Sequence, residues 1–448
     1  MITSISQIKL KQKEIIFKVK KYINKECSSD KNFFYKEHNY FINWAETEGK
    51  FKLISVVKNL FNFTLIDRLK FYFIKIIHQE QDYEIIDNSK IDYNYNNLFF
   101  SYFSKNDFVN STIIDRFFSV NTLKNKKSLW ILLYHGNDKI TLNKKYNNII
   151  ILKKKNFINN QIYFFLSILR FFLFSKKINF KKNKLYSSIN LILDKIINNN
   201  KISFFIYPFE SQPLQHYMKF LVNKINPSIK CLAYLHTALP ALPTEFIVSD
   251  LTQHNLILHG KINKIILKKL GWKSKNFIIN KSFRYKKRDK NFFRNKIFLP
   301  YDFKDSFHIL EQIKKIINFK KKKIYSSFEI VNHPFMTNSK KHLNLIKNLN
   351  EIMVDNKSKI NNFCLCVGST ATIIESLENG VDVIHLVNEP IFEVYTSFLW
   401  KNLKTKYLEK NIFFYSLTNK NSYIDFGTNN EFLRFQKKLS VNSFRKYN

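Results

Sequence analysis

The sequence predicts an α/β protein of two domains, and three observations support this prediction. The chain has 448 residues, more than the roughly 100 to 200 that single domains usually contain. Hydrophobic residues make up 45% of the chain and aromatic residues 16%, so there is enough apolar material for folded cores. In the second half, short apolar runs alternate with longer helical patterns, which is typical of βαβ units around a parallel sheet.

The N-terminal part shows helical patterns before any convincing strand pattern. Apolar residues recur at helical spacing over Ile8–Ile23 and Leu53–Ile77, and the first strands are predicted at Leu129–Tyr134 and Asn148–Leu152. Further along, the charged stretch Arg284–Lys296 lacks glycine and proline and separates two runs of α/β pattern. We therefore predict a linker there, between an α/β domain over residues 1–285, helical at its beginning, and a second domain over residues 295–425.

The second half contains seven strand patterns and two clear helical patterns. Lys261–Leu270 has apolar residues at helical spacing and ends at Gly271, a residue suited to closing a helix. Lys340–Met353 follows the same pattern. The predicted strands are Ile202–Tyr207, Lys230–Leu235, Asn255–Leu258, Lys296–Leu299, Phe328–Val331, Phe363–Val367 and Val381–Leu386.

The formal net charge of +40 is large, but the kind of basic residue argues against a nucleic-acid partner. Only 8 of the 74 basic residues are arginine, and Lys, Asn, Ile, Phe and Tyr are abundant together, as in proteins from AT-rich genomes. The basic residues are spread along the chain, with no arginine-rich arm and no zinc-finger spacing. We expect no nucleic acid as partner, and an anionic membrane or glycolipid remains an open alternative.

Cysteine spacing and apolar segments predict a cytoplasmic protein without a metal centre. Cys364 and Cys366 lie within an apolar strand pattern, which indicates burial and not a metal clip. The N-terminus has no signal-peptide pattern. The most apolar segment, Ile162–Phe174, is shorter than the roughly 20 residues that span a bilayer. It predicts a buried Phe-rich helix or, alternatively, an interfacial helix of a peripheral inner-membrane protein.

The strongest local signal lies in the turn Gly368-Ser369-Thr370. This turn follows the apolar strand Phe363–Val367, and Thr372 and Glu375 then have the spacing of a capping box before a helix that Gly380 closes. A helix that starts directly after a strand presents free N–H groups and the positive end of its dipole, which suits an anion. The two hydroxyl side chains of the turn add donors, and an ordinary helix cap is the alternative.

A second signal is His333-Pro334, which follows the strand Phe328–Val331. In open α/β sheets, ligands bind outside the carboxyl ends of the strands. An imidazole there can donate to a phosphate or, when protonated, neutralise a leaving group. Pro334 ends the strand and restricts where the ring points; a structural histidine is the alternative.

Two polar side chains in the N-terminal half also follow predicted strands. Glu210 and His236 each come shortly after an apolar run, and either could act as general base towards an acceptor hydroxyl. We expect burial to raise the pKa of Glu210 and so suit it to this role. Loop residues that cap a turn are the alternative. Arg284 and His135 are weaker candidates of the same kind.

Together, His333-Pro334 and, 35 residues after the histidine, Gly368-Ser369-Thr370 with Glu375 resemble the C-terminal domain of GT-B glycosyltransferases that use CMP- or CDP-activated donors. Bacterial sialyltransferases, capsule Kdo transferases and teichoic-acid polymerases belong to this group. The resemblance implies two Rossmann-like domains that face a cleft, an acceptor-side domain and a nucleotide-sugar-binding domain. It also implies that residues 426–448 return to the first domain as a helix.

The same resemblance implies the residues that bind the donor. It assigns the nucleotide phosphate to His333, Ser369 and Thr370, with their neighbours Pro334 and Gly368, and the ribose to Glu375. Residues 207–212 and His236 resemble stretches of surface-carbohydrate biosynthesis proteins. We therefore expect transfer of a sugar, CMP-linked as the resemblance implies, to a glycan or glycolipid during synthesis of capsule, O-antigen or lipopolysaccharide.

Glu210, His236 and His333 are the expected catalytic residues. No Asp-x-Asp motif occurs, so we expect metal-independent catalysis without a cofactor. The chain departs from the family by lacking an acidic pair followed by glycine and a Gly-rich loop after the first strand. A CDP-polyol phosphotransferase and a nucleotide-sugar epimerase of the same fold are alternative enzymes. A non-catalytic surface-assembly protein that binds a glycolipid or a partner is the alternative of another class.

Overall fold

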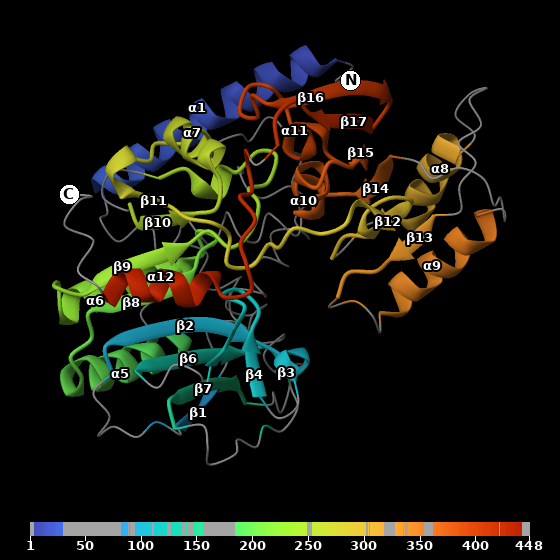
Figure 1. Ribbon diagram of the computed structural model, residues 1–448. Coiled ribbons are helices and arrows are strands. Elements are labelled where there is room, and N and C mark those ends of the chain that lie inside the picture. Colours follow the sequence, from blue (N-terminus) through green and yellow to red (C-terminus); the bar gives the residue numbers. More distant parts are fainter. Residues whose placement is uncertain are drawn as a thin grey trace, which may run out of the picture.

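The computed structural model shows an α/β protein with two large, mostly parallel sheets (Figure 1), which confirms the α/β class that we predicted. A small antiparallel sheet of β3 (Phe108–Val109), β4 (Thr112–Asp115) and β5 (Val120–Asn121) accompanies them. The structure describes residues 4–29, 82–87, 89, 95–109, 112–122, 127–136, 140, 147–155, 184–248, 253–301, 303, 305–317, 328–334, 336, 339–353, 362–420 and 422–440.

The larger sheet has eight strands in the order β1-β7-β6-β2-β8-β9-β10-β11. Every neighbouring pair is parallel except β1 and β7. The order reverses between β2 and β8, because β6 and β7 extend to one side of β2 and β8 to β11 to the other. The strands are β1 (Tyr83–Asp87), β2 (Asn97–Phe103), β6 (Ser128–Tyr134), β7 (Ile149–Lys154), β8 (Phe204–Pro208), β9 (Lys230–Tyr234), β10 (Asn255–Leu258) and β11 (Phe277–Ile279).

The second sheet has six strands in the order β13-β12-β14-β15-β17-β16. The first four are parallel, and β17 and β16 add an antiparallel hairpin at the edge. Here the order reverses between β12 and β14. The strands are β12 (Lys296–Phe298), β13 (Glu329–Val331), β14 (Phe363–Val367), β15 (Asp382–Leu386), β16 (Leu403–Glu409) and β17 (Ile412–Leu417).

Helices cover both faces of these sheets, as parallel strands require. On β2, Leu98 and Phe100 pack with helices on one face, and Phe99 and Phe103 join the cluster on the other. The first of these apolar clusters continues into the second sheet through β14 and β15. The helices are α1 (Ile5–Ser29), α5 (Lys184–Asn199), α6 (Pro213–Ile225), α7 (Lys261–Lys269), α8 (Ser306–Ile317), α9 (Lys340–Ile352), α10 (Thr372–Glu378), α11 (Pro390–Glu393) and α12 (Glu431–Ser440).

Two helices from the ends of the chain connect the sheets. The long helix α1 runs along both sheets in Figure 1, and its buried Gln12 donates to the carbonyls of Ile391 and Val394 at 2.9 and 2.8 Å. The segment after β17 returns as α12 to the eight-stranded sheet. There Phe432 lies 5.5 Å from Phe99, centroid to centroid.

The structure differs from several sequence-based expectations, and two predicted segments lie outside its described residues. The predicted capping box is wrong: α10 begins at Thr372, and Ala371 at its N-cap makes no side-chain cap hydrogen bond. Instead, Thr370 Oγ1 accepts the N–H of Thr372 at 3.3 Å. Strands β1 and β2 precede the first strand that we predicted. The segments Leu53–Ile77 and Ile162–Phe174 lie outside the described residues.

Candidate functional site between the two sheets

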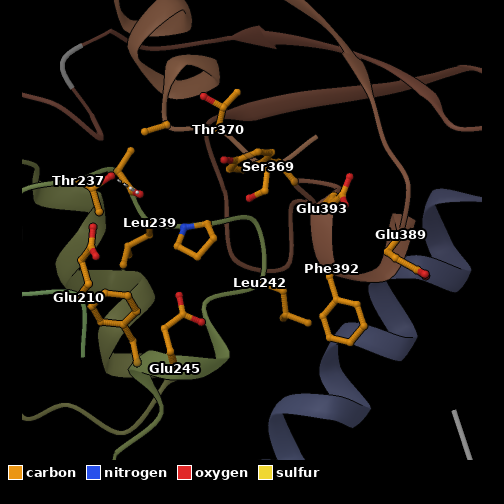
Figure 2. Close-up of a pocket in the computed structure, with 15 residues that line it drawn as sticks. Glu210, Thr237, Leu239, Leu242, Glu245, Ser369, Thr370, Glu389, Phe392 and Glu393 are labelled. Carbon is orange, nitrogen blue, oxygen red and sulfur yellow. Dashed lines mark hydrogen bonds between the residues drawn. The ribbon is translucent and has the colours of Figure 1, made fainter. Parts of the chain in front are cut away.

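A cavity of about 250 Å³ lies between loops that follow strands of both sheets (Figure 2). The eight-stranded sheet contributes the loops after β8 and β9, and the six-stranded sheet contributes those after β14 and β15. The lining residues are Glu210, Thr237, Ala238, Leu239, Pro240, Leu242, Glu245 and Phe246 on the first side and Ser369, Thr370, Ala371, Glu389, Phe392, Glu393 and Tyr395 on the second.

The cavity lies at the point where the strand order reverses in each sheet. Glu210 comes two residues after β8, and Ser369 comes two residues after β14. Both strands border a reversal of strand order, and crevices form at such points because the connections leave the sheet in opposite directions. The structure thus brings Glu210, Ser369 and Thr370, three of the predicted site residues, to one cavity.

Glu210 and His236 form a hydrogen-bonded pair at the first wall. His236 Nε2 lies 2.9 Å from Glu210 Oε1, and Gln212 Nε2 donates to Glu210 Oε2 at 3.2 Å. Burial alone would raise the pKa of Glu210, but His236, the charge of Arg284 and the Gln212 hydrogen bond outweigh it and lower this pKa. Our expectation of a raised pKa is therefore wrong, and Glu210 is a carboxylate at neutral pH.

His236 is almost fully buried behind Glu210 and does not line the cavity. Burial lowers its pKa, although Glu210 acts in the opposite direction, so the imidazole is neutral. Because a carboxylate can only accept, the neutral ring donates to it from Nε2. Within the described part of the chain, the buried Nδ1 has no hydrogen-bond partner, and the ring meets Phe117 edge-on with the ring centroids 4.5 Å apart.

The loop that carries Glu210 is held by a buried chain of hydrogen bonds. Ser211 adopts a positive φ of 59°, and its hydroxyl lies 3.1 Å from His216 Nε2. His216 Nδ1 lies 2.7 Å from His254 Nε2, and His254 Nδ1 lies 2.6 Å from the hydroxyl of Tyr207. A non-glycine residue with positive φ is strained, so the surrounding contacts must fix this loop.

Two residues of β15 hold the backbone of the turn after β14. Gly368 has a φ of 63°, its N–H donates to Leu386 O at 2.8 Å, and its carbonyl accepts from His385 Nε2 at 2.7 Å. Burial lowers the pKa of His385 to about 4, so the ring is neutral. Because both the N–H and the carbonyl of Gly368 are hydrogen-bonded, Ser369 and Thr370 reach the cavity from a defined backbone position.

His333 lies at the same edge of the second sheet but outside the cavity lining. Phe298 on β12 pairs with Val331 on β13 and with Cys366 on β14. His333 and Gly368 each come two residues later, so they lie at the same height along the strand direction. Two strand spacings place their backbones about 10 Å apart. The ring is half-buried 5.4 Å from Tyr301, and burial, followed by the charges of His342 and Arg284, lowers the pKa of His333.

Glu375 and Pro334 also lie outside the lining. Glu375 is in the first turn of α10, and its Oε1 is 3.6 Å from Arg288 Nε. Burial raises the pKa of Glu375, while Arg288 and Arg284 act against that rise. Pro334 is exposed beside His333. Of the eight predicted site residues, the cavity itself holds Glu210, Ser369 and Thr370.

Three carboxylates of the cavity were not predicted from the sequence. Glu389 and Glu393 follow β15, so the rule that drew attention to Glu210 could have found them. Glu245 is buried in a short 3₁₀ turn, which no strand pattern marks. With Glu210 they make four carboxylates, and no lysine, arginine or histidine is among the described residues that line the cavity.

The weaker candidates have different surroundings. His135 follows β6 beside Tyr102, with ring centroids 5.4 Å apart, and burial lowers its pKa to about 4. The described residues include no group of three or more His, Cys, Asp or Glu side chains placed to hold a metal ion. Within the same residues, no helix is both long and apolar enough to cross a bilayer.

Comparison of the chain with protein-family models, with curated proteins and with solved structures returns no match. The cavity therefore has to be interpreted from its own geometry and chemistry. Those consist of a carboxylate–imidazole pair on one wall and a hydroxyl-bearing turn on the other.

Proposed function

We propose that this protein transfers a sugar from a nucleotide-activated donor to a hydroxyl of a glycan or glycolipid, in a GT-B arrangement of two Rossmann-like halves. The observation that carries the proposal is the cavity at the strand-order reversals of both sheets, with Glu210 facing Ser369 and Thr370. The parallel order β7-β6-β2-β8-β9-β10 corresponds to the doubly wound order of dinucleotide-binding sheets, and β13-β12-β14-β15 to that of flavodoxin-like sheets.

The roles of the residues follow from their charge states. Glu210 is ionised and lines the cavity, so it can take the proton of an acceptor hydroxyl as that oxygen bonds to the anomeric carbon. The bond from this carbon to the donor phosphate breaks, and the nucleotide leaves with the bonding electrons. We assign the leaving phosphate to Ser369, Thr370 and His333, and the ribose to Glu375.

The acidic lining suits the acceptor side of this reaction. Carboxylates accept hydrogen bonds from sugar hydroxyls, and four of them lie around the cavity. The rings of Phe392 and Tyr395 and the side chains of Leu239 and Leu242 supply apolar surface for the faces of a sugar ring. We propose a neutral, hydroxyl-rich acceptor of a bacterial surface polysaccharide such as capsule or lipopolysaccharide.

A basic surface formed by α1 and its neighbours favours the peripheral association with an anionic membrane that we propose for this protein. Lys13 and Lys269 lie 5.7 and 5.2 Å from the centre of the Phe398 ring. Burial lowers the pKa of Lys269, and the charges of Lys401, Lys13 and Lys9 lower it further, so these lysines are close together. We call Lys9, Lys13, Lys269, Lys401 and Phe398 the lysine cluster. Cations grouped in this way attract anionic lipid headgroups.

The test of the proposed reaction is the variant Glu210→Gln. Calorimetric titration with CMP, CDP, UDP and GDP first identifies the nucleotide, and we expect a cytidine nucleotide to bind. Release of CMP from a CMP-linked sugar in the presence of acceptor should then fall by about 100- to 10,000-fold in the variant, the usual contribution of a general base. Nucleotide affinity should be unchanged. Equal turnover in Glu210→Gln, or the absence of nucleotide binding by the wild type, would reject the proposal.

A further inference from the structure

Arg284 lies on the segment that crosses from the eight-stranded to the six-stranded sheet (Figure 1). The side chain of Arg284 is exposed, whereas its backbone is fixed by a hydrogen bond to a buried side chain. The N–H groups of Arg284 and Phe283 both donate to the hydroxyl of Tyr234, at 3.3 and 3.0 Å, and Tyr234 is fully buried on β9. The guanidinium group therefore extends from a fixed position between the sheets.

This position is next to the cavity. The hydroxyl of Tyr285 accepts the N–H of Ala238 at 3.3 Å, and Ala238 is part of the cavity wall. The guanidinium carbon of Arg284 lies 5.5 Å from the centre of the Tyr285 ring. Arg284 is thus connected to the wall through one intervening aromatic side chain.

The charge of Arg284 acts on groups from both sheets. It lowers the pKa of Glu210 at the end of β8 and that of His333 at the end of β13, and it opposes the raised pKa of Glu375 on α10. Yet Arg284 forms no ion pair within the described part of the chain. The nearby Arg288, by contrast, pairs with Glu375 at 3.6 Å and stacks 4.1 Å above Phe292.

We infer that Arg284 binds the phosphate of the donor nucleotide from the crossing segment, between the residues that each sheet supplies. A guanidinium group offers several N–H donors in a planar fork that matches phosphate oxygens. The described residues that line the cavity include four carboxylates and no basic side chain, so an anion there needs a cation from outside this lining. Arg284 supplies that cation. This inference rests on the proposed function, because that function provides the phosphate.

The test compares CMP with cytidine, which differ by the phosphate alone. We expect the wild type to bind CMP about 10- to 100-fold more tightly than cytidine in calorimetric titrations, as expected of one charged hydrogen-bonded contact. Arg284→Met should lose most of this preference, since Ser369, Thr370 and His333 remain, while its affinity for cytidine stays unchanged, and Arg284→Lys should recover part of it. The matched control is Arg294→Met, because Arg294 pairs with the exposed Asn362 at 2.8 Å.

The outcomes separate this inference from the proposed function. If Arg284→Met keeps the preference for CMP over cytidine, the inference is overturned and the proposed function stands. If the wild type binds neither CMP nor cytidine but binds pyrophosphate, and Arg284→Met loses that binding, the anion site stands and the nucleotide function fails. If the wild type binds none of these three probes and none of CDP, UDP and GDP, both are overturned.

Discussion

In the Glu210–His236 pair, the surroundings determine the charge of each side chain. His236 is nearly fully buried and stays neutral, because its charged form would lose hydration. Glu210 is partly exposed at the cavity and receives hydrogen bonds from His236 and Gln212, so it stays ionised. The neutral imidazole therefore orients the carboxylate towards the cavity, as an aligned base requires.

His385 predicts a specific dependence of stability on pH. An unfolded histidine takes up a proton near pH 6.5, whereas burial holds the folded pKa of His385 near 4. The unfolded state binds more protons between these values, so this contribution is present above pH 6.5 and is lost as the pH falls towards 4. In urea unfolding, the loss of stability between pH 7.5 and 4.5 should be about 2 to 3 kcal/mol smaller in His385→Gln. An identical loss in both proteins would contradict the buried neutral state.

At the residue scale, the sequence indicated the position of some site residues but not their chemistry. Glu210, Ser369 and Thr370 could be predicted because polar residues that follow apolar strands meet at one sheet edge. The lowered pKa of Glu210 could not be predicted, because it depends in part on Gln212 and on Arg284, a residue of the crossing segment that is distant in sequence. Contacts between residues far apart in sequence leave no local pattern.

At the scale of elements, the strands with clear flanking turns were predicted well. The seven strands predicted in the second half and the two at β6 and β7 are present with small shifts at their ends. Strand β2 was missed, although it is the central strand of its sheet. Its sequence Asn97–Phe103 is apolar on both faces and so shows no alternation, and an apolar run alone does not distinguish a strand from a buried helix.

Helix α1 provides a test of membrane association. Leu10 and Phe17 are seven residues apart on one face and are 66% and 69% exposed, on the same helix as Lys9 and Lys13 of the lysine cluster. Leu10→Ser/Phe17→Ser should weaken sedimentation with anionic vesicles by roughly 10-fold or more, because both side chains would insert at the interface. Binding of the wild type should also fade as salt rises, since exposed charges are screened within about 8 Å at physiological ionic strength.

A matched control tests whether the position of these side chains matters. Leu191 and Phe307 are as exposed as Leu10 and Phe17, at 68% and 70%, but lie on α5 and α8. Leu191→Ser/Phe307→Ser should therefore bind anionic vesicles like the wild type. Equal loss in both double variants, or equal binding of the wild type to neutral vesicles at high salt, would contradict a membrane surface on α1.

At the scale of the whole molecule, two features keep the sheets facing each other. The apolar cluster continues from the larger sheet into β14 and β15, and α1 contacts both parts through Gln12 and Lys20. Lys20 donates to the carbonyl of Lys269, the last residue of α7, whereas Gln12 donates to carbonyls of the segment around α11. Because α11 carries cavity residues, α1 contacts a segment of the cavity wall and also carries part of the membrane-facing surface that we propose.

We propose that one cavity, formed by both sheets, binds the donor and the acceptor. Hydrogen–deuterium exchange with a non-transferable CMP–sugar analogue, measured with and without acceptor, tests it most directly. We expect slower amide exchange over residues 368–375 with the analogue, and over residues 237–245 as well when the acceptor is added, because these loops form opposite walls of the cavity. Slower exchange confined to one sheet, or found only at surfaces away from the cavity, would contradict the claim.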